Sequence, residues 1–141
     1  MPETLPDPPA GTEPGQAASP LDAAIGLRFF AVDGDAVLLR FDPAAVTHGG
    51  GDPVYLHGGA LASCVDTAAW EAIVRQAPGT WVAVDLRVDF ARPAGAGPHL
   101  VRAHARRIGR RLAIADVEIA PWDEPRRIVA LGRAQFARTD S

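Results

Sequence analysis

The chain has 141 residues, which favours a single domain, and its 48% hydrophobic and 22% charged residues are ordinary for a soluble globular protein. The formal net charge of −3 makes nucleic acid and anionic membrane surfaces poor partners for the chain as a whole. The single cysteine, Cys64, excludes an internal disulfide and a cysteine-rich metal site, and the lack of lysine excludes Schiff-base chemistry and a P-loop.

The N-terminal segment is rich in proline. Residues 1–20 hold six of the 13 prolines and no basic residue, so they bury too little apolar surface to offset the entropy of ordering them. We therefore predict a disordered tail over residues 1–22 and one domain over residues 23–141. The start of the chain lacks a secretory signal pattern, and no apolar run reaches the roughly 18 residues of a membrane span, so a cytoplasmic location is expected.

Two strands and a long helix are predicted next. Residues 27–33 and 36–42 flank Asp33-Gly34-Asp35, a turn that favours a β-hairpin. After a glycine-rich loop, residues 58–77 carry apolar side chains at spacings of three and four, which predicts a helix with a buried stripe. The stripe consists of Leu61, Val65, Ala68 and Ala72.

After the helix, the apolar period changes to two. Alternation over residues 82–90 predicts a strand with one solvated face. Residues 100–108 and 111–119 form two more strands around a turn, and residues 127–137 form the last. Short turns between these four strands favour antiparallel pairing.

The order of elements indicates the architecture. A sheet with one apolar face must cover that face, and only the helix, about 30 Å long, can do so. We predict an α+β chain with the hotdog fold, in which a single antiparallel β-sheet wraps around a long central helix.

Four sequence blocks resemble one enzyme family. They are HGGALASCVD (57–66), VAVDLRVDFARPA (82–94), RRIGRRLAIADVEI (106–119) and VALGRAQF (129–136). In this order they are similar to the phenylacetate-pathway (PaaI-like) branch of hotdog acyl-CoA thioesterases. The resemblance implies an acyl-CoA substrate, no metal, and no cofactor beyond the CoA of the substrate. It also implies that Asp66 is the catalytic carboxylate and that Gly58 offers its N–H to the thioester oxygen.

The residues themselves fit this chemistry. The first turn of a helix has free N–H groups and a positive dipole end, so His57-Gly58-Gly59 suits a site for an oxyanion. A glycine-rich turn that merely leads into the helix is the alternative. Aspartate is unfavourable inside an apolar helix, so Asp66 marks a candidate site unless it faces solvent.

The spacing of these residues predicts a shared active site. Gly58 and Asp66 are separated by about 12 Å along a helix, too far for both to touch one carbonyl group. Two antiparallel helices related by a two-fold axis would bring one of each together. We therefore expect a homodimer that combines Gly58 of one subunit with Asp66 of the other, as the resemblance also implies, and further pairing into a homotetramer.

Several arginines are candidates for binding CoA. Arg107, Arg110 and Arg111 surround a turn, together with Arg106, and guanidinium groups suit the phosphates of CoA. Charges at a strand edge also oppose aggregation, so a surface role is the alternative. Arg92 could contact CoA or close a turn.

Two aromatic side chains are candidates for the acyl pocket. Trp70 follows Asp66 by one helical turn and is expected in the pocket or at the dimer interface. Tyr55, just before the helix, is a similar pocket candidate.

Two positions depart from the family pattern. Members often carry asparagine or glutamine shortly before the His-Gly-Gly block, where this chain has residues 49–52 without an amide side chain. Members also often carry serine or threonine at the pocket position of Ala83. Asp52 or a water molecule is a candidate substitute. The alternatives left open are a non-catalytic acyl-CoA-binding hotdog protein, another hotdog enzyme such as a hydratase, and a structural oligomer.

Overall fold

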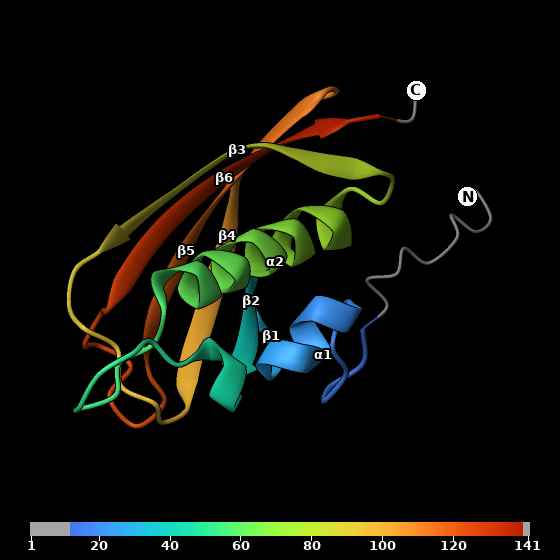
Figure 1. Ribbon diagram of the computed structural model, residues 1–141. Coiled ribbons are helices and arrows are strands. Elements are labelled where there is room, and N and C mark those ends of the chain that lie inside the picture. The colour runs from blue at the N-terminus through green and yellow to red at the C-terminus, as the bar shows by residue number, and fades with distance from the viewer. Residues whose placement is uncertain (1–11, 140–141) are drawn as a thin grey trace.

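The computed structural model describes residues 12–139, and Figure 1 shows a curved sheet lying across one long helix. The elements are, in chain order, α1 (Pro20–Ile25), β1 (Leu27–Asp33), β2 (Ala36–Phe41), the 3₁₀ helix η1 (Ala45–Thr47), α2 (Gly58–Gln76), β3 (Trp81–Phe90), β4 (His99–Ile108), β5 (Leu112–Pro121) and β6 (Ala130–Arg138). The predicted strands and the predicted long helix are all present, with small shifts at their ends.

The strands form a single antiparallel sheet in the order β1-β2-β4-β5-β6-β3, and α2 packs across one face of it (Figure 1). This is the predicted hotdog architecture. The predicted stripe of α2 faces the sheet, because Leu61, Val65, Ala68 and Ala72 are each at most 2% exposed. The alanines in this stripe let the helix lie close to the strands.

One strand pairing differs from the prediction. β3 pairs with β6 rather than with its successor β4, so the loop over residues 91–98 carries the chain from the sheet edge to its middle. A loop of this length does not impose pairing between its flanking strands, as a two-residue turn does. Leu56 fastens the loop, since its N–H donates to the carbonyl of Ala94 at 2.8 Å. β3 is consequently an edge strand.

β3 also lacks the single buried face that the alternation predicted. A register shift between Ala83 and Asp85 places Val84 in a bulge, so the side-chain phase changes within the strand. Four large apolar side chains of β3 remain exposed in the isolated chain: Val82 46%, Val84 56%, Leu86 40% and Phe90 55%. An apolar edge strand of this kind is a surface suited to pairing with another strand.

The described part of the predicted tail, residues 12–22, is ordered against the domain instead. Its backbone pairs with the free edge of β1, because Gly15 donates to the carbonyl of Phe29 at 2.8 Å and Phe29 donates to that of Gln16 at 2.9 Å. Thr12 is 6% exposed. Ser19 caps α1 and proline follows it at the first helical position, a favourable helix start that the composition concealed. Residues 1–11 of the predicted tail lie outside the described residues.

Candidate active site

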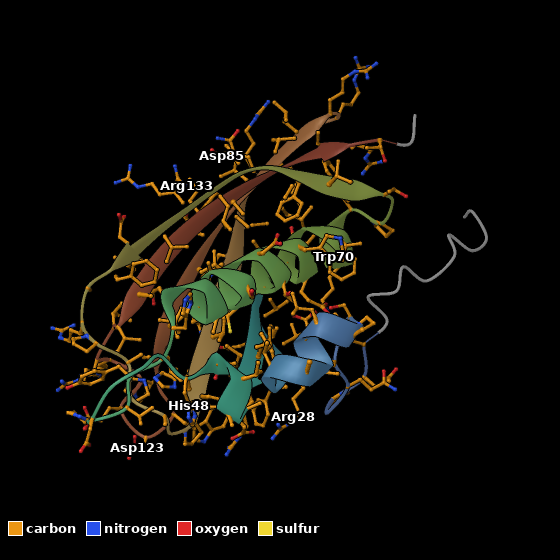
Figure 2. All side chains as sticks on the ribbon, viewed as in Figure 1. Arg28, His48, Trp70, Asp85, Asp123 and Arg133 are labelled. Carbon is orange, nitrogen blue, oxygen red and sulfur yellow. The ribbon has the colours of Figure 1, made fainter. Side chains whose placement is uncertain are left out.

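A pocket of about 320 Å³ lies beside the middle of α2. It is lined by Ala18, Ser19, Asp22, Asp66, Thr67, Trp70, Trp81, Ala83 and Phe136, and is called the Asp66 pocket below. Carboxylate and hydroxyl groups thus share the lining with aromatic rings. In the view of Figure 2, Trp70 lies between α2 and α1. Most of the lining comes from α2 and from the strand pair β3 and β6, while residues 18–22 close the pocket from the N-terminal side.

Asp66 has the environment of a reactive carboxylate. It is half-buried, and the structure records no hydrogen bond to its side chain from any described residue. Burial raises the pKa of Asp66 above the ordinary 3.8, and the negative charge of Asp22 raises it further. Carboxylates with raised pKa values in a pocket are candidates for proton transfer. The neighbouring thiol of Cys64 is fully buried, and burial raises its pKa too, so it is not prepared as a nucleophile.

The first turn of α2 offers a free backbone donor. His57 is the N-cap of α2, and its Nδ1 accepts the N–H of Gly59 at 2.9 Å. These two residues, both predicted to bind substrate, therefore cap the helix by bonding to each other. For the N–H of Gly58, by contrast, no acceptor is recorded within residues 12–139. The ring of Phe90 covers Gly58 so closely that a Cβ would lie 3.2 Å from its Cζ. Gly58 therefore has a backbone donor without a recorded acceptor in that range, and the ring of Phe90 packs against its Cα.

Within one chain, the two predicted catalytic residues do not meet. Gly58 does not line the Asp66 pocket. Gly58 and Asp66 are about 12 Å apart along α2, so this is expected. Trp70 and Ala83 do line the pocket with Asp66, as predicted. Tyr55 lies apart from the pocket, is 47% exposed, and forms an isolated bridge with Gly95.

The predicted CoA-binding arginines lie in two places. Arg107 belongs to the end of β4, and Arg110 and Arg111 occupy the turn before β5. Arg92 follows β3, and its Nη1 donates to the carbonyl of Ile128 at 2.6 Å. It lines an open cleft of about 530 Å³. The other lining residues are Glu124, Pro125, Arg126 and Arg127.

Several residues of these sites were not found from the sequence. Asp22, Ser19 and Ala18 fell within the predicted tail, and the start signal Ser-Pro-x-Asp could have drawn attention to them. Arg127 was absorbed into the predicted last strand, and Arg126 lay in the loop that Pro125 marks without being considered for a site.

Residues 55–130 match the sequence model of the family described as the thioesterase superfamily. The chain belongs to the thioesterase superfamily. This membership confirms the predicted enzyme class, a thioester hydrolase, and agrees with the hotdog fold. The matched range contains Gly58, Asp66 and Ala83.

Individual proteins agree with the family assignment. Medium/long-chain acyl-CoA thioesterase YigI of Salmonella typhimurium is 28% identical over 120 residues, which cover 74% of this chain and 77% of that protein. The E. coli PaaI protein from the phenylacetic acid degradation operon is 27% identical with a TM-score of 0.76, covering 87% of this chain and 86% of that chain. A mutant of the phenylacetic acid degradation protein PaaI from Thermus thermophilus is 27% identical with a TM-score of 0.73, covering 85% and 99%. The predicted resemblance to PaaI-like proteins is confirmed.

Two features are absent from the part of the chain that the structure describes. No helix there is long and apolar enough to span a membrane. Nor do residues 12–139 contain a group of three or more His, Cys, Asp or Glu side chains placed to hold a metal ion.

Proposed function

We propose that this thioesterase hydrolyses an acyl-CoA to the free acid and CoA, with Asp66 as the catalytic carboxylate. The observation that carries the proposal is a half-buried carboxylate that faces a pocket with aromatic rings in its lining from the middle of a helix. The likeness to YigI, which is named as an acyl-CoA thioesterase, supports the substrate class. The proposed reaction uses no cofactor beyond the CoA of the substrate.

In this reaction Asp66 acts in its ionised form, either as the base that takes a proton from water or as the nucleophile. Attack on the thioester carbonyl carbon places negative charge on the carbonyl oxygen, and the N–H of Gly58 at a helix N-terminus stabilises that charge. Collapse of the intermediate breaks the C–S bond, and CoA leaves as a thiolate that takes up a proton. In the nucleophilic route, water then hydrolyses the mixed anhydride to regenerate Asp66.

A second copy of the chain supplies Gly58 in the proposed site. The two groups are too far apart to act on one carbonyl within a single chain. The exposed apolar side chains of β3, at an open sheet edge, support pairing of two chains along this strand. A two-fold axis would then set the two α2 helices antiparallel, with Gly58 of each chain near Asp66 of the other. Pairing of such dimers into a tetramer stays a prediction.

The linings of the two cavities support assignments for the two ends of the substrate. The rings of Trp70, Trp81 and Phe136 favour an aromatic or a short to medium aliphatic acyl group. At the other end, Arg92, Arg126 and Arg127 line a cleft, and their guanidinium groups suit the CoA phosphates. Arg92 follows β3 in the chain, two residues after the Phe90 that covers Gly58. Binding of phosphate by Arg107, Arg110 and Arg111 stays a prediction.

A non-catalytic acyl-CoA-binding protein is the second candidate. Ala83 lines the pocket beside Asp66 without offering a hydroxyl group, and Asp52, a candidate substitute, is exposed and lies outside the lining. Both observations leave Asp66 with fewer polar helpers than the family pattern provides.

Thiol release from a panel of aromatic and aliphatic acyl-CoAs tests the proposal. We expect wild type to hydrolyse some of the panel and Asp66→Asn to lose about a hundredfold or more, on the order of the loss of a catalytic group. Asp35→Asn, the same change in an exposed turn, is the matched control and should keep full activity. Tight binding of acyl-CoA without hydrolysis by wild type would instead favour the second candidate.

A further inference from the structure

A second aspartate faces the Asp66 pocket from α1. Asp22 is 2% exposed, although it lines the pocket and carries an ionisable side chain. A carboxylate is buried to this extent only where hydrogen bonds replace its water. The Ser19 hydroxyl donates to Oδ2 of Asp22 at 2.7 Å, and the Thr67 hydroxyl donates to Oδ1 at 2.7 Å. A hydroxyl donor therefore holds each carboxylate oxygen of Asp22 in place.

The Thr67 bond links Asp22 to the catalytic turn of α2. Thr67 follows Asp66 directly in the helix, so the bond ties α1 to the residue beside the catalytic carboxylate. This contact also fixes the position of the Asp22 charge relative to Asp66. We propose that Asp22 is a positioning residue, whose fixed negative charge across the pocket makes Asp66 a stronger base or nucleophile in the hydrolysis. This inference rests on the proposed function of Asp66.

Within the described part of the chain, no charged side chain other than Asp22 and Asp66 lines the pocket. β3 contributes Trp81 and Ala83 to the lining, and β6 contributes Phe136, none of which titrates. Cys64 beside Asp66 is neutral, because burial raises the pKa of its thiol.

The next buried acid on α2 is neutralised locally. Glu71 accepts the Thr12 hydroxyl at 2.5 Å and pairs with Arg75 at 2.9 Å. Among residues 12–139, Asp22 is therefore the charged group that acts on Asp66. Its negative charge raises the pKa of Asp66, as burial does.

The direction of the effect gives a test. Without the Asp22 charge, the pKa of Asp66 should fall, because a like charge nearby favours the protonated form. The side-chain carboxyl carbon of Asp66, labelled with carbon-13 and assigned by its absence in Asp66→Asn, reports this pKa by NMR without any turnover. The acid limb of kcat/KM against pH reports it in the reaction.

Two variants that shift the pKa of Asp66 in opposite directions make the test decisive. Asp22→Asn keeps the size of the side chain and should move both readouts to lower pH. Ala18→Asp adds a carboxylate to the same lining and leaves the Ser19 hydroxyl on Asp22, and should move both to higher pH. Asp35→Asn, an exposed control, should move neither.

Because Ala18→Asp keeps Ser19 as the cap of α1 and as the donor to Asp22, it tests the inference even if Asp22→Asn fails to fold. A merely structural Asp22 would lower thermal stability or kcat at every pH without moving the Asp66 titration, and that result would overturn the inference. If wild type is active, Asp66→Asn is inactive and Asp22→Asn leaves the titration unchanged, the inference fails while the proposed function stands. A wild type without hydrolysis would remove both.

Discussion

At the scale of single residues, the proposed catalytic carboxylate, Asp66, carries a cost to the fold. Because the folded state raises its pKa, folding favours the protonated form of Asp66. Its contribution to stability is therefore fully present below the unfolded value near 3.8 and is lost as the pH rises through the higher folded pKa. At neutral pH the ionised carboxylate opposes folding.

Asp66→Asn should consequently stabilise the chain while it abolishes hydrolysis. We expect a Tm at pH 7 that is higher than that of wild type by on the order of 2–5 °C. The gain should shrink as the pH approaches 3.8, where wild-type Asp66 is protonated as well. Thermal unfolding followed by circular dichroism across pH measures this difference. An equal or lower Tm for Asp66→Asn at pH 7 would show that the ionised carboxylate is not a burden to the fold.

The sequence marked Asp66 as a candidate site residue but not Asp22, and this difference has a physical reason. Asp66 violates the pattern of its own helix, so its neighbours in the chain mark it. Asp22 becomes significant only through a hydrogen bond to Thr67, a contact between segments that are distant in sequence. The proline-rich composition of residues 1–20 also concealed the Ser19 cap.

At the scale of elements, the seating of α2 on the sheet depends on a glycine in β6. A Cβ at Gly132 would overlap both γ-methyl groups of Val65, which is 0% exposed on α2. Gly132 therefore lets the helix approach the strand that lies beside β3.

Gly132→Ala should destabilise the fold by about 1–3 kcal/mol, the usual cost of overpacking a core. Gly50→Ala is the matched control, because nothing lies within 4 Å of its Cβ position, and it should stay within about 0.5 kcal/mol of wild type. Urea unfolding at equilibrium gives both values. Equal stability of the two variants would mean that α2 is not held this closely to the sheet.

The elements were more predictable than their pairing. Period and turn signals placed α2 and the hairpin of β1 and β2 closely, because these depend on local spacing. The bulge at Val84 and the pairing of β3 with β6 depend on contacts across the sheet, which no local period contains. The alternation of apolar residues with Asp85, Arg87 and Asp89 therefore predicted an ordinary half-buried strand.

At the scale of the whole molecule, the proposed site is complete only in a dimer. One chain presents the Asp66 pocket, an open apolar edge at β3, and a free N–H at Gly58 that lies outside the pocket. These three features follow together if two chains pair along β3. The sequence predicted this from the roles that the family resemblance gives Gly58 and Asp66 and from helix geometry, since 1.5 Å per residue separates the two groups whatever the packing.

The most direct test of this account mixes two inactive variants. Gly58→Pro removes the proposed donor N–H at the first helical position, after His57 in an extended conformation that suits a following proline. The added Cβ requires the exposed ring of Phe90 to shift by a few tenths of an ångström. Asp66→Asn removes the carboxylate. In a mixed dimer, one of the two sites combines an intact Gly58 with an intact Asp66.

Thiol release by the two variants, each alone and then co-expressed in equal amounts, is therefore the measurement to make. The account predicts that each alone is inactive and that the mixture recovers about a quarter of wild-type activity, since about half of the dimers are mixed and each carries one working site. A mixture as inactive as its components, with mixed dimers present, would contradict the shared active site, and full activity of Asp66→Asn alone would contradict the catalytic role of Asp66.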